Sequence, residues 1–203
     1  MTETPNPPKI DDPDHDLIVA IQEGSPSLFT DLVQRYGKPL YNFGLKMCGK
    51  SDTAEDLVQE TFLNAFRYLG SFRRETKFKN WLYRIATSVC IKNRRKSKFA
   101  PERELSLEEF LPADEAAVER EVPSWAALPI DQVLDEELKQ HLQASILALP
   151  EKYRAVLLLR DIEGFSTEEA GQMLNLTPAN VKVRLHRARL FLKDRLKGYF
   201  ENE

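Results

Sequence analysis

Cysteine is scarce in this 203-residue chain, which contains only Cys48 and Cys90. Two cysteines without a shared motif favour packed apolar side chains over a disulfide scaffold and are typical of a reducing compartment. Long apolar runs are missing too, because stretches such as residues 155–159 are far too short to cross a bilayer. The N-terminal segment MTETPNPPKIDDPD lacks a basic start and an apolar core. It therefore predicts a disordered tail over residues 1–15 and no signal peptide.

The motifs of most enzymes are also absent. The three histidines and two cysteines share no metal-ligand spacing, and the sequence contains no glycine-rich phosphate loop and no nucleophile motif. The abundant Asp and Glu residues fit helix caps and a charged linker. We therefore expect no catalytic activity, no metal, no cofactor and no small-molecule substrate.

Charge of one sign is absent overall, since the net charge is only −3, but the charges are unevenly distributed. Residues 73–98 contain ten Lys or Arg against one acid, residues 102–137 contain twelve acids against two Arg, and residues 182–197 contain seven Lys or Arg against one acid. Two basic segments separated by an acidic one indicate two contacts with a polyanion. The alternative is three solvated faces without a partner.

Strict alternation of apolar and polar residues is missing as well, so strand signals are weak and apolar residues recur at helical spacing. The sequence predicts an all-α protein of two small helical domains. The first covers residues 16–97 and the second residues 133–203. The segment between them, residues 98–132, contains four prolines and the acidic excess, which predicts a flexible acidic linker.

Helix signals in the first domain are local. Gly37 and Pro39 predict a break in the helix that follows Ser25-Pro26. Asp52 with Glu55 three residues later resembles a capping box at the head of a helix that runs to about Leu69. The predicted core stripe of that helix is Ala54, Val58, Phe62, Ala65, Phe66 and Leu69, and its opposite face carries Asp56, Gln59, Glu60, Leu63 and Arg67.

The second domain contains the sharpest motif. Ser166 with Glu169 forms a second capping box ahead of a short helix, Thr167 to Leu174, and a tight turn leads to Thr177 and Pro178 at the start of the last helix. A short helix, a tight turn and a basic second helix make a helix-turn-helix. Side chains on its outward face would reach base edges in a major groove, and Ser166 and Thr167 would hold a phosphate. The outward residues are Ala179, Lys182, Val183, His186 and Arg187. The alternative is a helical hairpin with a solvated basic face.

A predicted helix from Phe78 to Lys96 supplies a second basic surface. Its polar side carries Trp81, Arg84, Ser88, Lys92 and Arg95 at helical spacing, opposite an apolar stripe of Phe78, Leu82, Ile85, Ala86 and Val89. Aromatic rings among cations suit single-stranded DNA, because bases stack on rings while Lys and Arg follow the backbone. Phe72, flanked by Arg73 and Arg74 in the preceding loop, fits the same pattern. The alternative for Trp81 is partly buried packing.

Three stretches together resemble the extracytoplasmic-function (ECF) sigma factors of bacterial RNA polymerase. Residues 52–62 (DTAEDLVQETF) and 72–85 (FRRETKFKNWLYRI) look like conserved region two of that family, and residues 149–189 look like region four. Both motifs occur in the family's order, and the resemblance covers about residues 16–97 and 133–197.

The resemblance implies a function and partners that the spacing alone does not give. It implies a sigma factor that binds core RNA polymerase, at the clamp of the largest subunit and at the flap, directs it to promoters and helps to melt them. Asp56, Gln59, Glu60 and Leu63 would dock on the clamp. The loop from Phe72 to Phe78 and the helix after it would open the minus-ten element and capture a flipped base, and the last helix would read the minus-thirty-five element.

Further expectations come from the same family. Most members are held inactive by an anti-sigma factor, often membrane-anchored, so the resemblance implies such a partner and a cytoplasmic location. Ser88 stands where many members have asparagine, and Val183 where many have a polar residue, which affects base preference rather than the overall role. The rival is a helix-turn-helix regulator that binds an operator, but residues 1–97 lack the alternating strand and helix pattern of a receiver domain.

Overall fold

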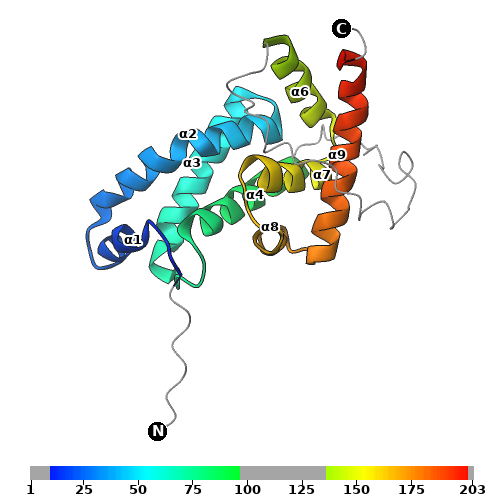
Figure 1. Ribbon diagram of the computed structural model, residues 1–203. Coiled ribbons are helices and arrows are strands. Elements are labelled where there is room, and N and C mark those ends of the chain that lie inside the picture. Colours follow the sequence, from blue (N-terminus) through cyan, green and yellow to red (C-terminus); the bar gives the residue numbers. More distant parts are fainter. Residues whose placement is uncertain (1–9, 97–135, 201–203) are drawn as a thin grey trace.

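Helices are the only regular elements in the described part of the protein. The computed structural model describes residues 10–96 and 136–200. In these ranges it contains α-helices, which are labelled in Figure 1, and short 3-10 and π segments that lie between them in the chain. The predicted all-α architecture is therefore confirmed. The predicted linker, residues 98–132, and the first nine residues of the predicted tail lie outside the described residues.

Residues 10–96 form the first bundle. Its elements are α1 (His15–Gln22), η1 (Pro26–Leu28), α2 (Phe29–Cys48), α3 (Ser51–Tyr68), η2 (Leu69–Ser71) and α4 (Phe78–Lys96). α2 and α3 lie side by side and α4 packs against both (Figure 1). The helices bury apolar side chains at helical spacing, such as Leu32, Leu40 and Phe43 on α2 and Leu82 and Ala86 on α4.

The contact between α2 and α3 requires glycine at one position. A Cβ atom at Gly44 would lie 3.1 Å from the Cβ of Ala54 and 3.1 Å from a methyl carbon of Leu57. The two helix backbones therefore approach closely at this point, where Ala54 and Leu57 are both buried. This contact fixes the position of α3 relative to the core.

Two local predictions for this bundle were wrong. α2 continues through Gly37 and Pro39 without a break, because packing of Tyr36 and Leu40 into the core offsets the lost backbone hydrogen bond and the steric clash that an interior proline causes. The capping box at Asp52 does not form. The helix starts one residue earlier with Lys50 as its N-cap, and Glu55 instead accepts a 3.3 Å hydrogen bond from the side chain of Ser51.

Residues 136–200 form the second bundle. Its elements are α6 (Glu136–Ala148), α7 (Glu151–Leu157), the π segment η5 (Leu158–Ile162), α8 (Thr167–Leu174) and α9 (Pro178–Phe200). The core stripe of α9 consists of Val181, Leu185, Ala188 and Leu192, which are all buried. Asp161 of the π segment accepts hydrogen bonds of 2.8 and 2.7 Å from the guanidinium of Arg189, which joins η5 to α9.

The two bundles pack against each other and share one continuous apolar core. α8 lies against α4, and α6 lies against α2, as Figure 1 shows. The guanidinium of Arg154 on α7 is buried and donates to the carbonyl oxygens of Met47, the last turn of α2, and of Leu149. It thereby satisfies helix-end acceptors of both bundles.

Candidate nucleic-acid interface

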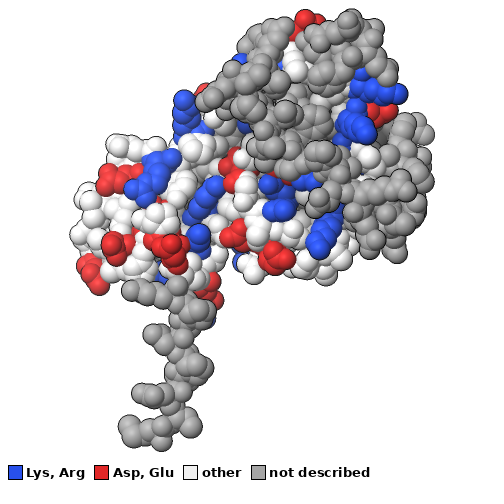
Figure 2. Space-filling view, viewed as in Figure 1, with Lys and Arg blue, Asp and Glu red and all other residues white. Residues whose placement is uncertain are grey.

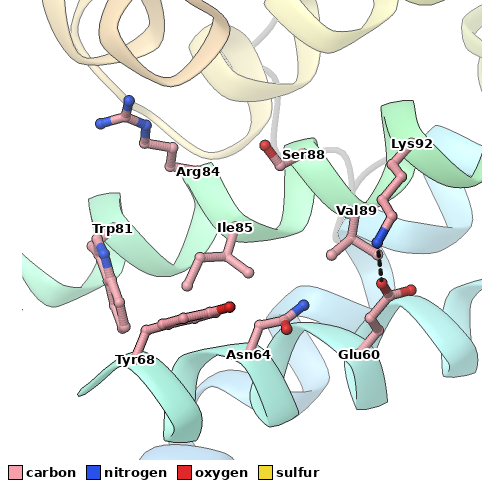
Figure 3. A pocket seen from close by; sticks show the side chains of 9 residues that line it. All are labelled: Glu60, Asn64, Tyr68, Trp81, Arg84, Ile85, Ser88, Val89 and Lys92. Atoms are coloured by element: carbon pink, nitrogen blue, oxygen red, sulfur yellow. Dashed lines mark ion pairs between the residues drawn. The ribbon is translucent and has the colours of Figure 1, made fainter. Parts of the chain in front are cut away.

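A groove of about 490 Å³ runs between α3 and α4. Residues of both helices line it: Glu60, Asn64, Tyr68, Trp81, Arg84, Ile85, Ser88, Val89 and Lys92 (Figure 3). Trp81 and Tyr68 close one end, and the ion pair between Lys92 and Glu60, 3.7 Å long, closes the other. Four of the residues predicted to bind the minus-ten DNA therefore meet in one place, although Arg84 and Ser88 point away from α3 in this view.

Two other predicted DNA-binding residues lie in the loop before α4. Arg73 and Arg74 are exposed, and Arg73 forms only a long ion pair of 4.0 Å with Glu75. Both cations are therefore accessible to a polyanion. Arg95 lies in the last turn of α4, where the structure gives the backbone alone.

Phe72 differs from its predicted role. Its side chain is 7% exposed, and its ring stacks on that of Trp81 with a centroid distance of 4.8 Å. The ring of Phe78 lies 6.2 Å from that of Phe72 on another side. An aromatic ring buried between two others cannot stack on a base in this conformation, so a direct contact of Phe72 with minus-ten DNA stays a prediction that would require the ring to move. The two arginines that follow Phe72 are exposed, whereas its ring is part of the core.

The predicted polymerase-binding face of α3 divides into two parts. Asp56, Gln59 and Leu63 are exposed, and Leu63 is the most exposed large apolar side chain of the described residues at 67%. Glu60 instead turns toward α4, where it accepts a 3.0 Å hydrogen bond from Asn93 in addition to the ion pair with Lys92. Phe66, predicted as core, is 51% exposed on the same side as Leu63. The sequence reasoning missed Phe66 because its position borders the apolar stripe.

The helix-turn-helix forms as predicted. Ser166 accepts a 3.1 Å hydrogen bond from the backbone of Glu169, and the Glu169 carboxylate accepts a 2.7 Å bond from the backbone of Ser166. The turn requires Gly171, because a Cβ there would lie 2.8 Å from the Leu176 carbonyl oxygen. Thr177 caps the last helix through a 3.3 Å bond to Asn180. Local sequence signals therefore determine this motif.

The outward residues of α9 differ in accessibility. Ala179 and Lys182 are exposed, whereas Val183, His186 and Arg187 are half-buried. Burial, together with the charge of Arg189, lowers the pKa of His186 from its ordinary value of 6.5, so this imidazole is neutral at pH 7. The exposed start of α9 is thus its most accessible part for a major groove.

Polar contacts between α4 and the second bundle were not predicted. The Asn80 amide donates a 2.6 Å hydrogen bond to Glu169, the Tyr83 hydroxyl donates a 2.6 Å bond to the carboxylate of Glu163, and Lys79 donates a 3.0 Å bond to the Glu163 carbonyl oxygen. The only available signal was spacing, since residues 80 and 83 share a third face of α4. Ser166, expected at a phosphate, therefore lies next to a carboxylate that is bound to α4.

Ionisation at this contact follows from burial and hydrogen bonding. Burial raises the pKa of Glu163, and bonding from Tyr83 and the charges of Lys79 and Lys46 offset only part of the effect. Burial acts against ionisation of Glu169 too, but hydrogen bonds from Ser166 and Asn80 hold its pKa below the ordinary value. The pKa values of the two carboxyl groups are therefore shifted in opposite directions.

Charged side chains are unevenly distributed over the visible face. Figure 2 shows Lys and Arg spread over the middle of this face, while Asp and Glu gather at its lower left, over α1.

Within residues 10–96 and 136–200, no three His, Cys, Asp or Glu side chains are grouped to hold a metal ion. In the same ranges, no helix is both long enough and apolar enough to span a membrane.

Comparison with known proteins gives the family. Residues 32–100 match the model for sigma-70 region 2, and residues 139–192 match that for sigma-70 region 4. The chain is 36% identical over 185 residues to the ECF RNA polymerase sigma factor SigW of Bacillus subtilis, covering 89% of this chain and 95% of that protein.

Solved structures show the same fold. The sigma factor RpoE of Bartonella quintana, in complex with the anti-sigma factor NepR, has a TM-score of 0.62 at 26% identity over 83% of this chain and 96% of that one. CnrH, in complex with the cytosolic domain of CnrY, has a TM-score of 0.65 at 23% identity over 91% of this chain and 97% of that one. With two region matches in order and a relative aligned over nearly its whole length, the chain belongs to the ECF RNA polymerase sigma factors, which are transcription initiation factors and not enzymes.

Proposed function

We propose that this sigma factor binds core RNA polymerase through α3 and recognises two promoter elements, melted minus-ten DNA at α4 and the minus-thirty-five duplex at α9. The observation that carries the proposal is the groove between α3 and α4, where the rings of Trp81 and Tyr68 lie at one end and Lys92 at the other, with Arg84 on α4 between them. Half-exposed rings next to cations suit unpaired bases and their backbone.

Base capture would take place in this groove. Its volume of about 490 Å³ falls within the range of small-ligand pockets, and Asn64 and Ser88 offer hydrogen-bonding groups to a base edge. The ion pair between Lys92 and Glu60 is partly exposed and therefore weak enough to open when a phosphate approaches. Phe72 would then act by supporting Trp81 from behind, instead of stacking on a base itself.

The loop before α4 would meet the displaced strand. Arg73 and Arg74 are exposed at its tip, close to the groove end formed by Trp81. Cations at this point would attract the phosphates of opened DNA. The loop would therefore act in melting, while the groove holds the base that melting releases.

Duplex recognition would rest on the last helix. Ala179 and Lys182 are exposed in its first turns, and Arg187 lies one and a half turns further along the helix. A helix with this distribution enters a major groove by its N-terminal half. Lys182 and Arg187 are the side chains that would pair with guanine.

Polymerase docking would use the exposed apolar part of α3. Leu63 and Phe66 lie one turn apart and are both more than half exposed, with Gln59 and Asp56 in the turns before them. Apolar side chains grouped on a solvent-facing helix mark an interaction surface. Glu60 faces the groove, so it would hold Lys92 at the groove end through their ion pair rather than contact the polymerase.

Promoter binding would require the two bundles to separate. About 25 base pairs lie between the minus-thirty-five and minus-ten elements, which at about 3.4 Å per pair places them about 85 Å apart. The hydrogen bond between Asn80 and Glu169 holds α4 and α8 in direct contact. One chain cannot keep this contact and reach both elements, so polymerase binding would open it, and the free protein would bind promoter duplex weakly.

An anti-sigma factor is the expected regulator. The sigma factor RpoE, of similar fold, has been solved in complex with the anti-sigma factor NepR, and CnrH in complex with the cytosolic domain of CnrY. We propose a partner of this kind for the present chain. The chain itself would act in the cytoplasm, where RNA polymerase is found.

Transcription with purified components tests the proposal. Core polymerase would be combined with the protein and with genomic DNA of the organism that encodes it, and the 5′ ends of the transcripts would be sequenced. We expect starts that share one pair of upstream elements. Transcription that is no more specific than that of core polymerase alone would overturn the proposal, and tight sequence-specific binding without polymerase would favour an operator-binding regulator.

A further inference from the structure

The loop between η2 and α4, residues 72–77, has a shape that its own sequence does not favour. Arg74 adopts a left-handed backbone conformation with φ of 59°, which is uncommon for a residue other than glycine. Its neighbours Arg73 and Glu75 are exposed and make only the 4.0 Å ion pair. The loop conformation therefore depends on contacts at its two ends.

One end of the loop is bound by α1. The side-chain amide of Gln22 donates a 2.8 Å hydrogen bond to the carbonyl oxygen of Leu69 and a 3.1 Å bond to that of Phe72. Leu69 is the first residue of η2 and Phe72 directly follows its last, so both carbonyl groups lie where the chain leaves α3. A single amide thus fixes the entry of the loop from a helix almost 50 residues earlier in the chain.

The other end is bound by the segment before α1. The carboxylate of Asp12 accepts a 2.7 Å hydrogen bond from the backbone N–H of Phe78, the first residue of α4. That N–H has no acceptor within its own helix, and a negative charge at a helix start is favourable. Asp12 therefore caps α4 from 66 positions away.

Asp12 and its segment are themselves fixed to the core. The other carboxylate oxygen of Asp12 accepts a 3.1 Å bond from the backbone of Asp14. Asp14 is fully buried, where it accepts hydrogen bonds from Arg35 and from the hydroxyl of Tyr36 on α2. Asp12 and Asp14, which the sequence placed in the tail of residues 1–15, are thus held in the fold, and the cap on α4 has rigid support.

We infer that Asp12 and Gln22 are positioning residues for promoter melting, which hold the loop of residues 72–77 in the conformation that presents Arg73 and Arg74 to the displaced strand. The inference rests on the proposed role of that loop. Both residues precede the segment that matches sigma-70 region 2, which begins at residue 32. The hydrogen bonds of these two residues therefore connect the loop of region 2 to a part of the chain outside the matched segment.

The test uses the full chain with core polymerase on two templates, a duplex promoter identified as above and the same promoter with a pre-opened mismatch bubble. The variants are Asp12→Ala, which removes the cap on α4, and Gln22→Glu, which removes the amide donor of both hydrogen bonds at the loop entry. Loss of one cap should slow open-complex formation on the duplex by about fivefold, measured by permanganate reactivity of thymines. The bubble template and the affinity for core polymerase should be affected much less.

Conservative and neighbouring substitutions separate positioning from general stability. Asp12→Asn keeps one acceptor oxygen for the N–H of Phe78, and asparagine caps a helix about as well as aspartate does, so this variant should melt the duplex faster than Asp12→Ala although it loses the hydrogen bond from Asp14. Asp11→Ala removes the same charge at an exposed neighbouring position and should behave as the unaltered protein. Thermal unfolding of each variant identifies one that fails to fold, and Gln22→Glu then remains as the independent measurement.

Arg73→Ala combined with Arg74→Ala tests the loop itself. If this double variant melts the duplex normally, the proposed role of the loop is wrong. If it melts slowly while Asp12→Ala and Gln22→Glu melt normally, the positioning inference is overturned and the loop role survives. Equal losses on duplex and bubble for both Asp12→Ala and Gln22→Glu would also overturn the inference.

Discussion

The side-chain amide of Asn80 on α4 donates a 2.6 Å hydrogen bond to the carboxylate of Glu169 on α8, although 89 positions separate the two residues. The same carboxylate completes the capping box that starts the helix-turn-helix. One glutamate therefore joins the surface proposed for melted DNA to the motif proposed for duplex DNA. Whatever separates the two bundles must break this bond.

Replacing Asn80 with Asp should open the structure. The change removes the donor and places a second carboxylate against Glu169 in a buried position, and a hydrogen bond to a charged group is worth about 1.5–3 kcal/mol. We expect a shift toward separated bundles of about tenfold or more, seen as a larger radius of gyration in small-angle scattering. Asn42→Asp adds the same charge at an exposed position of α2 and should change nothing. An unchanged radius for Asn80→Asp would mean that the apolar contacts alone hold the bundles together.

The helix-turn-helix could be predicted from the sequence because its signals are local. The caps at Ser166 and Thr177 lie within three residues of the groups they bind, so the sequence alone identifies them. The contact of Asn80 with Glu169 could not be predicted, since neither residue indicates its distant partner. The exposure of Phe66 and the burial of Phe72 could not be predicted for a related reason, because long-range packing decides both: Phe66 borders the apolar stripe of its helix, and Phe72 lies in a loop without helical spacing.

Closure of the bundles should weaken as pH rises. Burial raises the pKa of Glu163, so the packed state disfavours its ionised form, and packing loses stability as pH rises from the ordinary value of 4.5 through the raised pKa. Glu163→Gln should abolish this dependence and be more compact at neutral pH, while Glu168→Gln, an exposed neighbour, should keep it. The measurement is the radius of gyration as a function of pH. Glu169 acts in the opposite sense but below 4.5, since its pKa is lowered, which keeps the two windows apart.

Replacing Leu63 with Asp should reduce binding to core polymerase. Leu63 is 67% exposed, so the substitution leaves the fold intact while it places a charge in the proposed docking surface. We expect at least a tenfold weaker affinity, about 1.4 kcal/mol, in a titration of labelled protein with core polymerase. Thr30→Asp adds the same charge on an exposed part of α2 and serves as the control. Reversing the charge of Glu60 is a poorer probe, because it also breaks the ion pair with Lys92. Equal binding by Leu63→Asp and the control would remove α3 from the docking surface.

The thiol of Cys90 should react slowly in the folded protein. Its sulfur lies 3.4 Å from that of Cys48, and this hydrogen bond, together with burial, raises the pKa of Cys90, so the thiol is neutral at pH 7. Cys48 is the more exposed of the two. Alkylation with iodoacetamide followed by peptide mass spectrometry should therefore label Cys48 first and Cys90 only after addition of denaturant. Preferential labelling of Cys90 in the native protein would contradict the packing described for α2 and α4.

Replacing Arg187 or Lys182 tests which side chains of α9 read the minus-thirty-five element. Arg187 is predicted to read a base in duplex DNA, so Arg187→Ala should weaken recognition of the minus-thirty-five element by about 1–3 kcal/mol and relax specificity at one position. Lys182 is more exposed and lies five residues, about one and a half turns, nearer the start of the helix. Transcription by the holoenzyme on a set of promoters with every single substitution in this element would distinguish base readout from phosphate contact for both variants. A uniform loss over the whole set, with a salt dependence reduced by about one phosphate contact, would identify Arg187 as a backbone contact. The recognition face would then lie nearer the N-terminus of α9, around Ala179 and Lys182, where the side chains are most accessible.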